Sequence, residues 1–199
     1  DEKANVTISG NEKLQFGENS EWVGNFYNNI ASLYSICGNY SQALKLYEKA
    51  LDIQLKKFTP EHPVVANTYN NIGSVYSSLG NYAKAAEFFQ KTLVIQEEKL
   101  GTNHPKTATT YSNMGCLLNK LGQHEKALEY LLKDLQIQEK EFGQEHPNTV
   151  ISYNNIGGVY ESQGNYPLAL EYYQKALQIQ KKILGDDHPN LSNILNNIG

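Results

Sequence analysis

Tyr69-Asn70-Asn71-Ile72-Gly73 is one copy of a short stretch that recurs along the whole chain. Related copies begin at residues 27, 69, 111, 153 and 195, so each begins 42 residues after the one before it. A constant period of this length indicates a repeat array, in which each repeat is one supersecondary unit that stacks on its neighbours. The period therefore predicts the architecture of the chain, but it does not identify a ligand.

The second copy shows what one repeat contains. Pro63 suits the first turn of a helix, and apolar residues follow it at spacings of three and four. Gly80-Asn81 predicts a turn, and a second apolar stripe then runs to Gly101, which we expect to end the second helix in a left-handed conformation. Each repeat is thus a helical hairpin that can bury its apolar side only by stacking. We expect helices near residues 21–37, 40–57, 63–79, 82–100, 105–121, 124–142, 147–163, 166–184 and 189–199.

The residues of this hairpin resemble the tetratricopeptide repeat. The matching pattern is aromatic-x-x-Ile-Gly-x-x-Tyr, then Gly-Asn-Tyr, then Ala-x-x-x-Tyr/Phe-x-x-Ala, and the common form has 34 residues. The longer 42-residue form found here resembles the repeats of kinesin light chains and their relatives. The resemblance covers about residues 20–199 and implies an all-α fold, a right-handed α-solenoid of stacked antiparallel helical hairpins. In the fourth repeat the matching residues are Tyr153, Ile156, Gly157, Tyr160, Gly164, Ala169, Tyr173 and Ala176.

The period also divides the chain into segments. Phe16-Gly17 aligns with Phe142-Gly143 three periods later, so residues 11–16 are either the worn end of a preceding second helix or part of a disordered tail. The expected segments are an N-terminal segment at residues 1–19, four repeats at residues 20–61, 62–103, 104–145 and 146–187, and the partial first helix of a fifth repeat at residues 188–199.

The third repeat departs most from the pattern. Asp134 stands where the pattern has Ala, in a position that is usually packed. We expect Asp134 to reach the edge of the packed layer and to mark a local opening between hairpins. His124 stands where the other repeats have Tyr, and we interpret it as a replaced core tyrosine.

Composition argues against several classes of partner. The chain has 17 Lys+Arg and 21 Asp+Glu, a net charge of −4, which gives no basic stripe for nucleic acid or an anionic membrane. No apolar run approaches the ~20 residues that a membrane-spanning helix needs. Cys37 and Cys116 are too few for a disulfide framework or a zinc site. With no leader pattern at the start of the sequence, we expect a cytoplasmic setting.

The sequence gives no sign of catalytic or cofactor chemistry. His62, His104, His146 and His188 recur at the repeat period, which places them on successive hairpins roughly 10 Å apart. Metal ligands must converge around bonds of ~2 Å, so we interpret each His-Pro pair as a helix start. Phosphate loops, nucleophile elbows and His-Glu-x-x-His motifs are absent from the sequence. We therefore expect no enzyme activity, no metal and no cofactor.

Asparagine provides the one regular feature outside the core. In tetratricopeptide arrays the first helices line a concave groove, and the resemblance places the Asn positions there. An Asn side chain both donates and accepts, so a row of them could bind the backbone of an extended peptide. The alternative is that one Asn of each pair bonds a neighbouring helix and the other faces water. The candidate groove residues are Asn25, Asn28, Asn29, Asn67, Asn70, Asn71, Ser74, Ser112, Asn113, Asn154 and Asn155.

Three functions fit these observations. The first is a protein-interaction scaffold that binds an extended peptide or a partner helix in the Asn-rich groove. The second is a motor-cargo adaptor like the kinesin light chains, whose heptad-rich motor-binding region is absent from this sequence. The third is the sensor array of a larger multidomain signalling protein. We expect a protein or peptide partner rather than nucleic acid or membrane, and end-to-end self-association through the partial fifth repeat.

Overall fold

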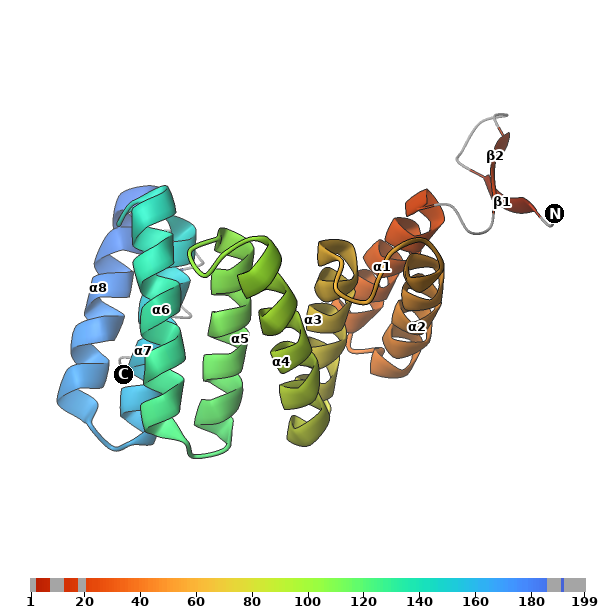
Figure 1. Ribbon diagram of the computed structural model, residues 1–199. Coiled ribbons are helices and arrows are strands. Elements are labelled where there is room, and N and C mark those ends of the chain that lie inside the picture. The colour runs from red at the N-terminus through yellow and green to blue at the C-terminus, as the bar shows by residue number, and fades with distance from the viewer. Residues whose placement is uncertain (1–2, 8–12, 18–20, 186–190, 192–199) are drawn as a thin grey trace. The chain divides into compact units, whose positions relative to one another are not determined.

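The computed structural model describes residues 3–7, 13–17, 21–185 and 191. Within these residues the chain forms eight helices and two short strands (Figure 1). The helices all begin at the expected residues, and five of them end one residue earlier than expected. The bounds are β1 Lys3–Thr7, β2 Lys13–Gly17, α1 Glu21–Ile36, α2 Tyr40–Lys57, α3 Pro63–Ser78, α4 Tyr82–Lys99, α5 Pro105–Lys120, α6 His124–Phe142, α7 Pro147–Ser162 and α8 Tyr166–Leu184.

Helix ends follow local sequence signals. Gly80 has a φ of +74° after α3 and Gly101 has a φ of +94° after α4, which confirms the left-handed ending expected of Gly101. At the starts of α3, α5 and α7, a histidine precedes proline, and its Nδ1 accepts a hydrogen bond from the backbone N–H two residues later. These bonds are 3.2 Å in His62, 3.1 Å in His104 and 3.1 Å in His146. His-Pro is therefore a helix cap in these three repeats, and His188 lies outside the described residues.

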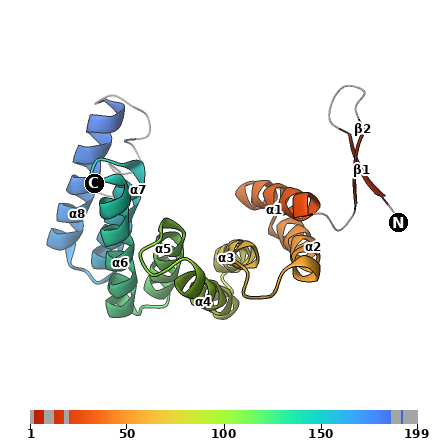
Figure 2. The same cartoon turned by 45° about the horizontal axis from the view of Figure 1, so that its top comes forward.

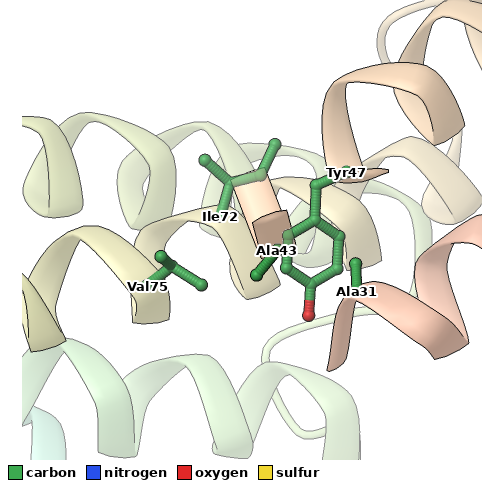
Figure 3. Close-up of a cluster of buried hydrophobic side chains, with 5 residues drawn as sticks. All are labelled: Ala31, Ala43, Tyr47, Ile72 and Val75. Atoms are coloured by element: carbon green, nitrogen blue, oxygen red, sulfur yellow. The ribbon is translucent and has the colours of Figure 1, made fainter. Parts of the chain in front are cut away.

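The chain divides into two compact units, residues 1–95 and 96–199. In unit 1, a buried cluster joins α1, α2 and α3 through Ala31, Ala43, Tyr47, Ile72 and Val75 (Figure 3). The Tyr47 side chain is only 2% exposed in this cluster. The core of the unit therefore lies between hairpins as well as within them.

In unit 2, α5 to α8 lie side by side as two stacked hairpins (Figure 1 and Figure 2). Their shared core contains Ala127, Leu131, Leu135, Ile156 and Val159. Because α5 packs on α6 and also contacts α7, the first helices of the two hairpins are neighbours. Among the described residues, no helix has both the length and the apolarity required to cross a bilayer.

The N-terminal segment differs from the expectation. Residues 13–17 form strand β2, which pairs antiparallel with β1 in a register that places Ala4 opposite Phe16. Residues 13–17 are therefore a strand in this structure rather than the end of a second helix. The physical reason is the alternation of polar and apolar residues in Lys13–Phe16, a period of two that favours a strand. The helix expected at residues 189–199 lies outside the described residues, except for the buried Leu191.

Candidate functional site

The candidate groove residues occupy four columns on the first helices, with one position per repeat in each column. Within a helix the columns are three, four and seven residues apart, so they share one face. We call this the first-helix face of each unit. The columns are Asn25, Asn67, Thr109 and Ile151; Asn28, Asn70, Ser112 and Asn154; Asn29, Asn71, Asn113 and Asn155; and Ser32, Ser74, Cys116 and Gly158.

Some members of these columns face solvent and others are partly covered. Asn25 and Asn29 are exposed, whereas Asn67, Asn70 and Asn113 are half-buried. The Oγ of Ser74 donates to the backbone oxygen of Asn70 at 3.1 Å, one turn earlier in α3.

In unit 1, a ladder of hydrogen bonds connects three helices. Asn71 of α3 donates from Nδ2 to Oδ1 of Asn28 in α1 at 2.8 Å, and Asn28 donates in turn to the hydroxyl of Thr68. Thr68 donates to Oε1 of Gln54 in α2 at 2.8 Å. Thr68 and Gln54 are 0% and 2% exposed. Asn28 and Asn71 therefore bond neighbouring helices, as the alternative interpretation of the Asn pairs expects.

The buried end of this ladder recurs one period later. In unit 2, Thr110 donates to Oε1 of Gln96, again at 2.8 Å, and both side chains are buried. In both pairs an uncharged hydroxyl donates to an uncharged amide oxygen, so we call these two the neutral ladders. Pairing a buried donor with a buried acceptor avoids the cost of leaving either without a hydrogen bond.

The next copy of the ladder, between α6 and α7, is rebuilt around Asp134. Ser152 donates to Oδ2 of Asp134 at 2.7 Å instead of to Gln138. Gln138 donates from Nε2 to Oδ1 of Asp134 at 3.0 Å, and its own Oε1 is buried with no hydrogen-bond partner in the described structure. On the first-helix face, Asn155 donates to Oγ of Ser112 at 3.1 Å. Ser112 also hydrogen-bonds Asp134.

Asp134 does not reach the edge of the packed layer, so that expectation is wrong. Asp134 is only 2% exposed, because hydroxyl and amide groups donate hydrogen bonds to its carboxylate inside the fold. Burial raises the pKa of Asp134, and hydrogen bonds from Ser152, Gln138 and Ser112 partly oppose this effect. The position is buried in every complete repeat, as Ala50, Thr92 and Ala176 show.

An opening does accompany Asp134. A cavity of about 260 Å³ lies between α5 and α7 with α6 beneath it. Two short side chains help to create the space, because Ser112 stands where unit 1 has Asn28 and Ser152 stands where it has Thr68. All four columns contribute to the cavity wall, which is formed by Thr109, Ser112, Asn113, Cys116, Asp134, Gln138, Asn148, Ile151, Ser152 and Asn155.

A second cavity lies in unit 1, away from the predicted groove residues. It measures about 470 Å³. Lys91 of α4 forms part of its wall, with its Nζ 2.7 Å from Glu87 and 5.9 Å from the centre of the Tyr69 ring. Val94 lines the same cavity and is 55% exposed. Val94 is the sequence signal that could have indicated this cavity. It is apolar, whereas the equivalent positions in the other repeats carry polar residues.

Sequence reasoning also missed half of the cavity beside Asp134. The residues that it did not place in the groove are Asp134, Gln138, Asn148, Ile151 and Ser152. A signal was available, because Gln54, Gln96 and Gln138 recur at the period, and so do Thr68, Thr110 and Ser152. Within the described residues, no group of three or more His, Cys, Asp or Glu could hold a metal ion.

Comparison with known proteins now identifies the family. The family model described as tetratricopeptide repeat matches residues 22–98, 64–140, 117–181 and 149–199. The chain belongs to the tetratricopeptide-repeat family. These matches overlap along most of the sequence, as expected for an array of equivalent tetratricopeptide repeats. The comparison with curated proteins found no match.

Solved structures share this tetratricopeptide fold. BtubC (BKLC) from P. vanneervenii is 24% identical, with a TM-score of 0.77, over 89% of this chain and 71% of that one. The nearly identical TPR-like repeats of a Podosopora anserina putative kinesin light chain are 24% identical, with a TM-score of 0.75, over 90% of this chain and 85% of that one. A point variant of the same Podosopora protein is 24% identical, with a TM-score of 0.75, over 89% of this chain and 84% of that one. These similarities confirm the expected fold class, an all-α solenoid of stacked helical hairpins.

Proposed function

We propose that this tetratricopeptide array is a non-catalytic scaffold that binds an extended peptide along its first-helix faces. The observation that carries the proposal is the cavity of about 260 Å³ in unit 2, because all four columns of candidate residues contribute to its wall. Family membership supports a role in protein–protein interaction. The side chains on this face are mainly uncharged donors and acceptors, which suit a peptide backbone.

The hydrogen bonds within the fold separate two roles among the candidate residues. Asn28, Asn71 and Asn155 join neighbouring helices. Asn25 and Asn29 are exposed and are available for a ligand. Neutral hydrogen bonds contribute little net free energy and the peptide must be ordered, so we expect an affinity on the order of micromolar.

Two narrower functions remain proposals. The likeness to repeats of a putative kinesin light chain supports a motor-cargo adaptor. A sensor array of a larger signalling protein would use the same peptide-binding face. Heptad repeats adjoining this array in a parent protein would favour the adaptor, and a nucleotide-binding motif there would favour the sensor.

The expected setting and self-association are also proposals. Free Cys37 and Cys116 suit a reducing compartment, which supports a cytoplasmic location. The sequence of the partial fifth repeat carries Ile194, Leu195 and Ile198 at helical spacing, which supports end-to-end association. Sedimentation velocity of the chain and its Leu195→Asp variant tests this. A single monomeric species at every concentration of the unchanged chain would contradict it.

A peptide array probed with the full chain tests the main function. Asn25→Ala with Asn67→Ala should weaken peptide binding roughly tenfold, because two neutral hydrogen bonds are lost. The matched control is Gln136→Ala with Gln174→Ala, which removes two exposed side chains from second helices. Equal binding by both double variants, or no peptide bound by the unchanged chain, would overturn the proposal.

A further inference from the structure

We propose that the cavity beside Asp134 receives a basic side chain, Lys or Arg, from a peptide bound on the first-helix face of unit 2. This inference rests on the proposed function and specifies its ligand more narrowly. The ladder that contains Asp134 differs from the neutral ladders in its hydrogen bonds.

At the buried ends of the neutral ladders, a hydroxyl donor and an amide oxygen satisfy each other. In the Thr68–Gln54 and Thr110–Gln96 pairs, the hydroxyl donates directly to the amide oxygen at 2.8 Å. The third pair would do the same if residue 134 were Ala, as residue 50 is. Instead, Asp134 accepts the hydrogen bond that Ser152 donates and a second one from the Nε2 of Gln138.

This exchange produces a surplus of acceptors around the cavity. The Oε1 of Gln138 is buried and has no partner in the described structure, and Gln138 is only 5% exposed. Asp134 accepts hydrogen bonds from Ser152, Gln138 and Ser112, and a carboxylate has about four acceptor sites, so about one site remains for a further donor. A group that supplies several donors and no acceptor is therefore the chemical complement of this site. Lys and Arg are the side chains that do so.

Charge points in the same direction. Of the ten residues whose side chains form the cavity wall, Asp134 alone is acidic and none is basic. Cys116 is a neutral thiol, because burial raises its pKa to about 11. A buried carboxylate without a cation is costly, and a cation that enters the cavity relieves that cost. An anionic ligand would meet repulsion instead.

The rim suits the rest of a basic side chain. Ile151 lines the cavity and is 55% exposed. The equivalent positions in repeats 1 and 2 are Asn25 and Asn67, so an apolar rim accompanies the acidic floor only here. The aliphatic stem of Lys or Arg packs on apolar surface while its charged end reaches a polar partner.

Small cations test the cavity without any assumption about peptides. n-Butylammonium and n-butylguanidinium reproduce the ends of Lys and Arg, and n-butanol is the uncharged control. We expect saturable shifts in the amide NMR signals of Ser112, Gln138 and Ser152 with one or both cations and no such shifts with n-butanol. The full chain is the sample.

Asp134→Ala is the matched variant, because Ala occupies the equivalent position in Ala50 and Ala176. It should restore a direct bond from Ser152 to Gln138 and abolish the saturable shifts. Asp134→Asn removes the charge but keeps the shape, so it answers the same question if Asp134→Ala does not fold. Equal shifts in the charge-free variants, equal shifts with n-butanol, or no saturable shift in the unchanged chain would each overturn the inference.

Peptides then connect the cavity with the proposed function. In each peptide that the chain binds on the peptide array, the basic residues are replaced by norleucine one at a time. One replacement should weaken binding to the unchanged chain by roughly tenfold and should leave binding to Asp134→Ala unchanged. Peptides that bind both proteins equally and need no basic residue would overturn this inference and leave the scaffold function standing. If n-butylammonium binds but no peptide does, the scaffold proposal fails instead.

Discussion

Gly157 sets the spacing between α7 and α8. A Cβ added there would lie 2.6 Å from the Tyr173 ring, whereas one added at Gly158 would meet only the Tyr173 hydroxyl at 3.6 Å. We predict that Gly157→Ala lowers the free energy of unfolding by ~1–3 kcal/mol through overpacking. Gly158→Ala should instead raise it by up to ~1 kcal/mol, because Gly is a poor helix former. Urea unfolding of both variants measures the difference, and equal effects would refute the close contact.

Asp134 should make stability depend on pH. Burial raises its pKa above the ordinary value of 3.8, so the folded chain holds this proton more tightly than the unfolded chain does. The stability contributed by the proton is present below pH 3.8 and is lost as the pH rises through the folded pKa. We therefore predict that the gain in unfolding free energy from Asp134→Asn grows from acidic to neutral pH.

Urea unfolding across this pH range measures that gain. Cys116 faces the same cavity, but its pKa of about 11 keeps it neutral throughout. The control is Asp52→Asn, which removes an exposed charge from α2. A gain from Asp134→Asn that does not change with pH, or that changes as it does for Asp52→Asn, would contradict the prediction.

These residues show how far single positions could be predicted. The pattern marked Asp134 as a departure from the repeat and indicated an opening, because both follow from comparing equivalent positions. Its burial could not be predicted, since that depends on Ser152 and Gln138 arriving from different helices. The hydrogen bond between Asn155 and Ser112 joins residues 43 positions apart. It could not be predicted either, because its two residues lie on different helices.

At the scale of elements, His104 caps α5 by accepting the backbone N–H of Lys106 at 3.1 Å. We predict that His104→Ala lowers the free energy of unfolding by ~0.5–2 kcal/mol, and that His104→Asn retains most of it, because Asn also caps helices. His62 and His146 are less direct tests, since both also stack on aromatic rings. Thermal unfolding compares the variants. An Asn variant as unstable as the Ala variant would show that the cap contributes little.

Element boundaries were predictable where the signal was local. His-Pro opens α3, α5 and α7, and Asn precedes α2, α4 and α8, so these starts carry a local signal. Gln123 before α6 makes no side-chain cap bond, yet every described helix begins at the expected residue. Several ends were placed one residue too late, because the last residue before glycine is already the C-cap, as Leu79 is after α3. The repeat period does not predict strand β2, because Phe16 aligns with Phe142 of a second helix, whereas the two-residue alternation around Phe16 favours a strand.

At the scale of the whole chain, the 42-residue period predicted the array because every repeat carries the same hairpin signal. The period could not predict ligand chemistry, which resides in the departures from it. Replacing Asn28, Thr68 and Ala50 by Ser112, Ser152 and Asp134 changes no helix, yet the changed positions line a cavity with an acidic floor. A solenoid tolerates such changes because each repeat contacts only its neighbours.

Because each repeat contacts only its neighbours, local unfolding of one hairpin should not spread along the chain. If stability is a sum of repeat and neighbour terms, a lesion in one hairpin should increase opening there and should spare distant hairpins. Gly157→Ala should therefore speed hydrogen exchange in α7 and α8, where the added Cβ meets Tyr173, and leave α1 and α2 protected. Hydrogen-exchange mass spectrometry of peptides from each helix measures this, with Gly158→Ala as the matched control. A uniform loss of protection in all helices would instead mean that the chain unfolds as one cooperative body.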